Sequence, residues 1–171
     1  IQNTLLFFID VIRSLPVLIF LLWVYYFLPV LAGKNIPAFW CAVVALSINL
    51  TVFVADVVRG AIEGIPKGYV EAARALGMSK ALTMRRIILP EALRQLVPTF
   101  TMLYITMLKF STLASVIAVY ELLHSADGII SNTYKTLEVY TAVAVIFILI
   151  ILPLIYLSRW MEGSKWFLRR V

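Results

Sequence analysis

The sequence has few of the charged residues that soluble domains carry. Only 14% of its 171 residues are charged, 63% are hydrophobic, and the mean hydropathy is +0.98. A soluble domain has roughly 25% charged and roughly 45–50% apolar residues, and a domain of this size cannot hide such an excess in its core. Disorder requires the opposite composition. The sequence therefore excludes an ordinary cytosolic domain and predicts a protein whose solvent is lipid.

Cysteine and histidine are nearly missing as well. The chain has one cysteine, Cys41, and one histidine, His124. A single cysteine excludes an internal disulfide framework and a zinc site with paired cysteines. The sequence also contains no Walker-type glycine loop for a nucleotide. We therefore expect no metal site, no catalytic residue and no cofactor in this chain.

Long apolar runs take the place of these residues. A membrane helix needs roughly 20 mostly apolar residues, and the runs show no period-two alternation, which favours helices over strands. Four stretches qualify, at about 15–31, 37–58, 98–120 and 139–157. The sequence predicts an all-α membrane protein with four spans in one transmembrane domain, 1–171.

Basic residues are distributed unevenly between these spans. Residues 59–94 carry seven basic and three acidic side chains, and the tail after Ser158 adds four basic ones. The loops 32–36 and 121–138 contain one lysine each. Positive residues mark the cytoplasmic side in short loops. We therefore expect residues 59–97 and the C-terminus in the cytoplasm. This topology explains the net charge of +6 without a nucleic acid partner.

The long loop between the second and third spans carries helix signals. Pro66 suits a first helical turn, and Gly77 can adopt the positive φ that ends a helix. Ser79 is a good N-cap for a second helix through Ile88, and Pro90 interrupts the pattern again. The sequence predicts a short helix, a glycine turn and a second short helix. By composition alone, an interfacial amphipathic hairpin fits equally well.

The spacing in this loop is more specific than its composition. The order is Glu71-Ala72-Ala73, three residues, Gly77, nine residues, then Ile87-Ile88-Leu89-Pro90. This resembles the EAA loop of the permease subunits of bacterial ATP-binding-cassette (ABC) importers. In that family the loop reads EAA, three residues, glycine, nine residues and I-x-LP, and every fixed position matches here.

Flanking segments extend the resemblance over nearly the whole chain. The segments 13–16, 56–62 and 109–113 resemble those of the polar amino-acid subfamily, although Phe110 replaces the acidic residue usual after Lys109. Family members usually have five spans with an external N-terminus. Four spans with a cytoplasmic start, in a chain that begins at Ile1, fit that pattern with a fifth, N-terminal span missing.

The resemblance implies a fold, a location and partners. The fold is the helical bundle of type I ABC importer permeases, in the bacterial inner membrane. The implied partners are an ABC ATPase dimer that binds ATP and Mg, a second permease subunit (the same or a sister chain) and an extracytoplasmic substrate-binding protein. The residues that would couple to the ATPase are Glu71, Ala72, Ala73, Arg74, Gly77, Ile87, Leu89 and Pro90.

Polar residues inside the spans are candidates for a substrate pathway. Charged side chains there are expensive and usually face a cavity or a partner. Lys109 is expected near the middle of the third span, and Asp56 lies near the end of the second, where Arg59 is an alternative partner. The candidates are Lys109, Asp56, Asn49, Ser111, Thr112 and Ser115.

The resemblance leaves the solute open. A polar amino acid is the leading expectation, and an opine, a peptide or an ion is the alternative within transport. A non-transporting membrane scaffold with an amphipathic hairpin is a third hypothesis, from a different class. A membrane enzyme fits least, because the sequence shows no nucleophile–base pair.

Overall fold

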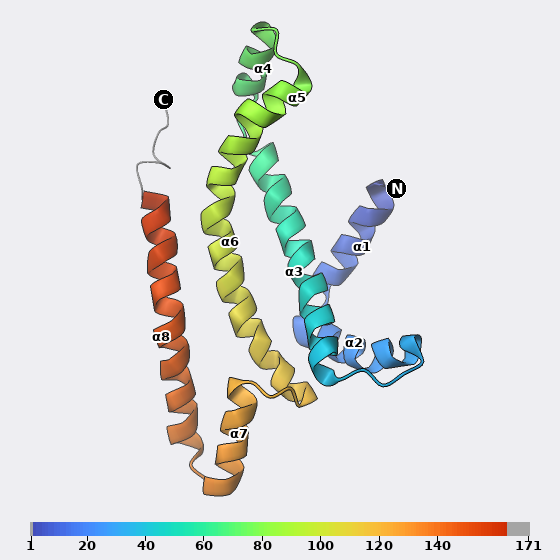
Figure 1. Cartoon of the computed structure of the whole chain (residues 1–171), viewed down its shortest axis with the longest axis vertical. Helices are drawn as coiled ribbons and strands as arrows, with labels where there is room; N and C mark the ends of the chain where they lie inside the picture. Colours follow the sequence, from blue (N-terminus) through green and yellow to red (C-terminus); the bar gives the residue numbers. More distant parts are fainter. Residues whose placement is uncertain (1, 164–171) are drawn as a thin grey trace.

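The computed structural model describes residues 2–163, and every regular element in that range is helical. The elements are α1 (Gln2–Ser14), α2 (Val17–Ala32), α3 (Ala38–Glu63), α4 (Lys67–Ala75), α5 (Lys80–Thr83), the π-helical η1 (Met84–Ile88), α6 (Leu89–Ser111), the 3₁₀-helical η2 (Thr112–Ile117), α7 (Leu122–Thr133) and α8 (Thr136–Gly163). Figure 1 shows α3, α6 and α8 running along the long axis of the molecule, with α4 and α5 at one end and α7 at the other. The predicted all-α class is confirmed.

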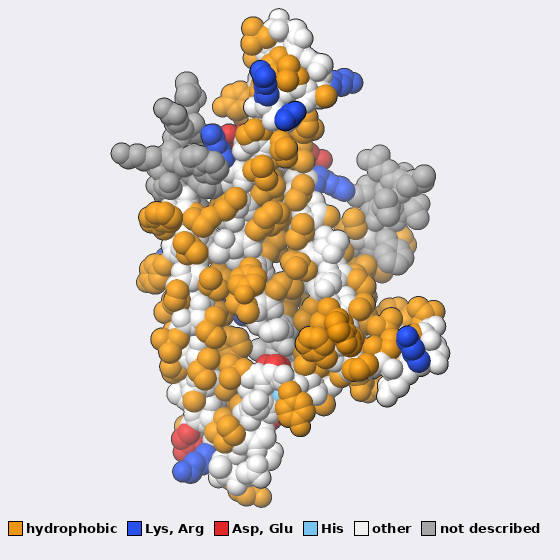
Figure 2. Space-filling view, in the orientation of Figure 1, with side chains coloured by type: hydrophobic (Ala, Val, Ile, Leu, Met, Phe, Trp, Pro, Cys, Tyr) orange, Lys and Arg blue, Asp and Glu red, His pale blue; other side chains and the backbone are white. Residues whose placement is uncertain are grey.

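Three helices in the described range are long and apolar enough to cross a membrane. They are Ala38–Glu63, Lys80–Ile117 and Thr136–Met161. These helices match the second, third and fourth predicted spans, but the third begins well inside the predicted loop. Figure 2 shows apolar side chains over the body of the molecule and several basic ones around the α4–α5 end.

The first predicted span, 15–31, differs from the structure. The helix in this range, α2, has 16 residues, which at 1.5 Å per residue gives about 24 Å. That is shorter than the hydrocarbon layer of about 30 Å. The chain instead forms α1, breaks at Leu15–Pro16, and continues as α2, which runs across the lower end of α3 (Figure 1). The break follows because Pro16 has no N–H and its ring disfavours the helical conformation at Leu15.

Two buried clusters hold α3 at the centre of the bundle. One joins α1, α2, α3 and η2 through Ile12, Phe20, Leu21, Val24, Ala42, Ala45, Val52, Ala114 and Ile117. The other joins the end of α3 to the start of α6 through Ala61, Ile65, Ala92 and Leu96. Alanines recur in both clusters because their small side chains let the helix backbones approach closely. In lipid, van der Waals packing rather than the hydrophobic effect drives helices together.

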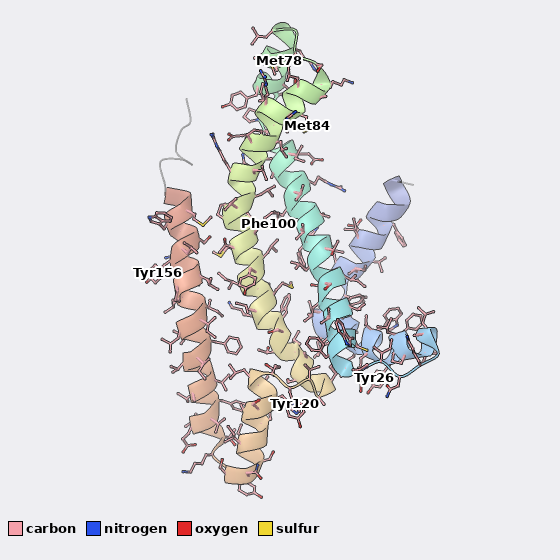
Figure 3. The ribbon with its side chains drawn as sticks, viewed as in Figure 1. Tyr26, Met78, Met84, Phe100, Tyr120 and Tyr156 are labelled. Atoms are coloured by element: carbon pink, nitrogen blue, oxygen red, sulfur yellow. The ribbon has the colours of Figure 1, made fainter. Side chains whose placement is uncertain are left out.

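The helix α8 is held more lightly. Only 6% of its spanning window is buried within the chain, compared with 28% for α3. The buried Ser158 hydroxyl donates a hydrogen bond of 3.4 Å to the carbonyl of Pro98 on α6. Most of α8 is therefore available to lipid or to another subunit; the ring of Tyr156, for example, is exposed (Figure 3).

The sequence predicted that the second helix of the loop would be interrupted at Pro90, but in the structure the helix continues through this residue. The elements α5, η1 and α6 form one continuous helix, which extends as Lys80–Ile117 when η2 is included. A π-turn precedes the proline, and the Leu89 N–H donates to the carbonyl of Met84, five residues back. The wider turn relieves the clash that the ring of Pro90 would make with the backbone of the preceding helical turn.

Candidate functional site

The end of α4 is a tightly defined turn. Gly77 has φ of +75°. Its N–H donates to the carbonyl of Arg74 at 2.9 Å, and the Met78 N–H donates to that of Ala73 at 3.0 Å. This pair of bonds is a Schellman motif, which needs a residue in the left-handed conformation. The glycine turn predicted from the sequence is confirmed.

The next helix begins with the predicted cap. The Ser79 hydroxyl oxygen accepts a bond of 3.3 Å from the Leu82 N–H. The buried Thr83 hydroxyl donates to the Ser79 carbonyl at 3.0 Å. The turn between α4 and α5 is therefore fixed on both sides, and α4 has a defined direction relative to the long helix.

The predicted coupling residues divide into inner and outer sets. Ala73 is only 1% exposed and packs inward, and Ile87 is half-buried. Glu71, Ala72, Arg74, Gly77, Leu89 and Pro90 are exposed. Leu76, which the sequence did not single out, is 81% exposed at the end of α4. We call Glu71, Ala72, Arg74 and Leu76 the tip surface.

The tip surface has the chemistry of a docking face. The small side chain of Ala72 lets a partner approach the helix backbone closely, and Leu76 adds an apolar side chain. Glu71 and Arg74 form no ion pair within the described part of the chain. Both charges are therefore available to a partner, at the rim of an otherwise small and apolar contact.

The inner side of α4 rests on methionines. A cavity of about 200 Å³ between α4 and the α5–η1 segment is lined in part by Arg74, Met78 and Met84. Figure 3 places the two labelled methionines at this end of the molecule. Unbranched methionine side chains fill irregular gaps and adapt when neighbours move.

A second group of predicted residues lies where α6 passes into η2. Lys109 is exposed in the last turn of α6, closer to the helix end than the predicted mid-span position. The Ser111 hydroxyl donates to the Leu108 carbonyl at 2.8 Å, and the Thr112 hydroxyl donates to the Lys109 carbonyl at 2.7 Å. Ser115 is half-buried in η2. These four residues are brought together by sequence proximity, at a change of helix type.

Asn49 lies nearby but is inaccessible in this conformation. Its side chain is 2% exposed, and its Oδ1 has no hydrogen-bond partner among the residues that the structure describes. It shares a helix face with Ala45 and Val52, which pack against η2 in the first cluster. Asn49 is therefore a buried contact between α3 and its neighbours here, rather than a surface of an open path.

Asp56 is separate from that group, and its partner is not Arg59, the alternative that the sequence left open. Arg13 Nη1 donates to Asp56 Oδ2 at 2.6 Å, and this pair joins α1 to α3. The alternative pairing with Arg59 is wrong in this structure. The sequence pointed to Arg13 only as part of the segment 13–16, which resembles the polar amino-acid subfamily. An arginine just before a helix-breaking proline, inside an apolar segment, was the signal that could have identified it.

Comparison with known proteins now decides the family. The sequence profile of the family described as "Binding-protein-dependent transport system inner membrane component" matches residues 1–165. The chain belongs to this family. The expectation from the EAA spacing is confirmed, as is an inner-membrane permease with several spans.

The relatives and a solved structure agree with the family. The chain is 38% identical to the glutamine transport system permease protein GlnP of Escherichia coli (strain K12), over 94% of this chain and 74% of that protein. It is 34% identical to the octopine transport system permease protein OccM of Rhizobium meliloti, over 96% and 70% respectively. A crystal structure of an amino acid ABC transporter with histidines superposes with a TM-score of 0.85 at 40% identity, covering 90% of this chain and 72% of that one.

Proposed function

We propose that this chain is a permease subunit of an ABC importer for a polar amino acid, and that the tip surface docks on a separate ATPase. The observation that carries this proposal is the geometry of the tip. A short helix, fixed by the Gly77 turn and the Ser79 cap, stands at the end of a helix that continues through the membrane region. The likeness to an amino acid ABC transporter supports it.

The continuous helix gives the tip a mechanical role. Lys80–Ile117 has 38 residues, so a displacement of α4 is passed along one rigid element to Lys109 and η2. The partner ATPase dimer binds ATP and Mg, and its closure moves the docked α4. Two arrangements of the spans, one inward-open and one outward-open, are then biased by nucleotide binding at a distance.

The solute and remaining partners are part of the same proposal. A polar amino acid is favoured because the relative with the higher identity of the two is a glutamine permease. A second permease subunit completes the pathway, and an extracytoplasmic binding protein delivers the solute. Lys109, with Ser111, Thr112 and Ser115, contributes polar groups to the pathway wall.

The docking part of the proposal predicts co-purification. Coexpressed with its cognate ABC ATPase, the tagged chain should bring down that ATPase. Proteoliposomes of the complex should take up at least one of the 20 common L-amino acids with ATP. Glu71→Lys should lower the amount of ATPase that co-purifies about tenfold or more. The lysine would meet either a like charge or no charge on the ATPase at the rim of the contact. Glu63→Lys, the same change at the end of α3, should not. A complex that forms equally well with Glu71→Lys would remove α4 from the interface.

The orientation predicts which loops react from outside the cell. Cysteines at Lys34 and Ser131 should react with an impermeant thiol reagent, and those at Lys80 and Lys165 should not; Lys165 lies outside the described residues. The native Cys41 is 0% exposed, so its background should be low. Lys34 lies in the loop between α2 and α3, and Ser131 lies in α7; Figure 1 shows both segments toward the end of the bundle away from α4 and α5. The reversed labelling pattern would place α4 outside, where an ATPase cannot dock.

A further inference from the structure

We propose that Arg13 and Asp56, together with the helix break that follows Arg13, form a recognition site for the zwitterionic end of the transported amino acid. In this site Arg13 binds the α-carboxylate and Asp56 binds the α-ammonium. The inference rests on the proposed function and deepens it, since it names the groups that read the feature shared by all amino acids.

The first support is the position of the pair. Asp56 lies inside the spanning helix Ala38–Glu63, about two turns before its end. The side chains of Arg13 and Asp56 are nevertheless 57% and 30% exposed. Charged groups exposed to hydrocarbon are expensive, so such side chains face a water-filled cavity or another protein surface. The exposed side of this pair is therefore a place where a polar solute can arrive.

The second support is the unused bonding capacity of the pair. A guanidinium has five N–H donors, and a carboxylate has two acceptor oxygens. The pair is joined through Nη1 and Oδ2 alone, and the part of the chain that the structure describes supplies neither side chain with another bond. The remaining edge of Arg13 can hold a carboxylate through two parallel bonds, and Asp56 Oδ1 can accept from an ammonium. An amino acid can thus add to the pair as a ring of alternating charges, without an uncompensated charge at any stage.

The third support is the break in the backbone beside the pair. Arg13, Ser14, Leu15 and Pro16 are all exposed at the junction of α1 and α2. In membranes, a broken helix is tolerated only where protein buries it or where it borders a water-filled cavity. Because the helix break is exposed in this chain, its neighbour in the membrane is either a water-filled cavity or a second subunit. Discontinuous helices of this kind border the solute sites of many transporters.

The alternative role is a clamp, in which the pair only ties α1 to α3. The two roles differ in what a charge swap does. Arg13→Asp combined with Asp56→Arg restores an ion pair between the helices, and therefore a clamp. It exchanges the places of the positive and negative groups, so an amino acid bound by both ends would present its side chain in the wrong direction.

The test measures uptake in proteoliposomes of the complete complex, with the L-amino acid that the wild type takes up best as the radiolabelled probe. Its N-acetyl derivative and its decarboxylated amine serve as competitors. Arg13→Gln and Asp56→Asn should each raise the KM about tenfold or more, as expected for a lost charge-assisted bond. Arg13→Gln should also remove the preference over the amine, and Asp56→Asn the preference over the N-acetyl derivative. Arg13→Lys should recover part of the KM. The control Arg59→Gln removes an exposed arginine one turn along α3 and should leave both preferences intact.

Several results would overturn the site. It fails if the charge swap restores the wild-type KM together with thermal stability, because the pair is then a clamp. It fails if the single variants transport with unchanged KM and preferences, or if Arg59→Gln has the same effect as Arg13→Gln. If the permease subunits of the Arg13 or Asp56 variants separate on size-exclusion chromatography, the pair belongs to a contact between subunits instead. If the wild-type complex takes up no amino acid, the proposed function fails and this inference fails with it; uptake by the wild type separates the two.

Discussion

Gly77→Val should abolish transport and substrate-stimulated ATP hydrolysis while the protein still inserts in the membrane. Gly77 has φ of +75°, and a Cβ at this position would meet no neighbouring atom within 4 Å. The penalty is therefore one of backbone conformation rather than of space, about 1–2 kcal/mol for an ordinary side chain. Relief of that strain would open the Schellman turn and change the direction of α4. ATP hydrolysis and uptake in the same proteoliposomes provide the measurement.

Two further variants separate the turn from a general loss of stability. Gly77→Asn should keep most activity, because asparagine tolerates the left-handed region better than other residues with a side chain. Gly128→Val places the same side chain in α7, where the glycine lacks a positive φ and the space is also open. It should leave coupling unchanged. Normal transport by Gly77→Val would show that the direction of α4 does not matter for coupling.

Lys109→Met should leave assembly with the ATPase intact and lower uptake of the native amino acid about tenfold or more, as the loss of one charged contact would. Lys109 is exposed on a spanning helix and forms no ion pair with the described residues. A charged side chain on a spanning helix is costly in lipid, and a water-filled pathway relieves that cost. Uptake of the labelled amino acid, with co-purified ATPase as the assembly measurement, tests the role.

The last-turn position of Lys109 supplies a competing explanation. A cation at a helix C-terminus is favoured by the helix dipole whatever the pathway does. Lys109→Arg keeps the favourable interaction of a cation with the helix dipole and should retain more uptake than Lys109→Met. Lys34→Met removes a lysine from the loop after α2 and serves as the matched control. If Lys109→Met transports the same amino acid with the same KM and preference, Lys109 has only a structural role.

Sequence alone was sufficient wherever the determining interaction is local or is set by the solvent. The apolar runs predicted the second, third and fourth spans. In lipid a helix must form all of its backbone hydrogen bonds internally, and it needs roughly 20 apolar residues to cross the bilayer. Gly77 and Ser79 predicted the turn and the cap, since both act on backbone groups within three or four residues. The EAA spacing identified the family, which the comparisons confirmed.

Tertiary structure decided what depends on distant segments. Arg13 and Asp56 are 43 residues apart, so only the packing of α1 against α3 made them partners in place of Asp56 and Arg59. The π-turn let the helix continue past Pro90, although a proline there usually ends one; the packing of Ala92 and Leu96 against α3 favours that continuity. The burial of Asn49 likewise follows from the contact between α3 and η2. Local chemistry determined the elements and their caps, and long-range packing determined which polar groups meet.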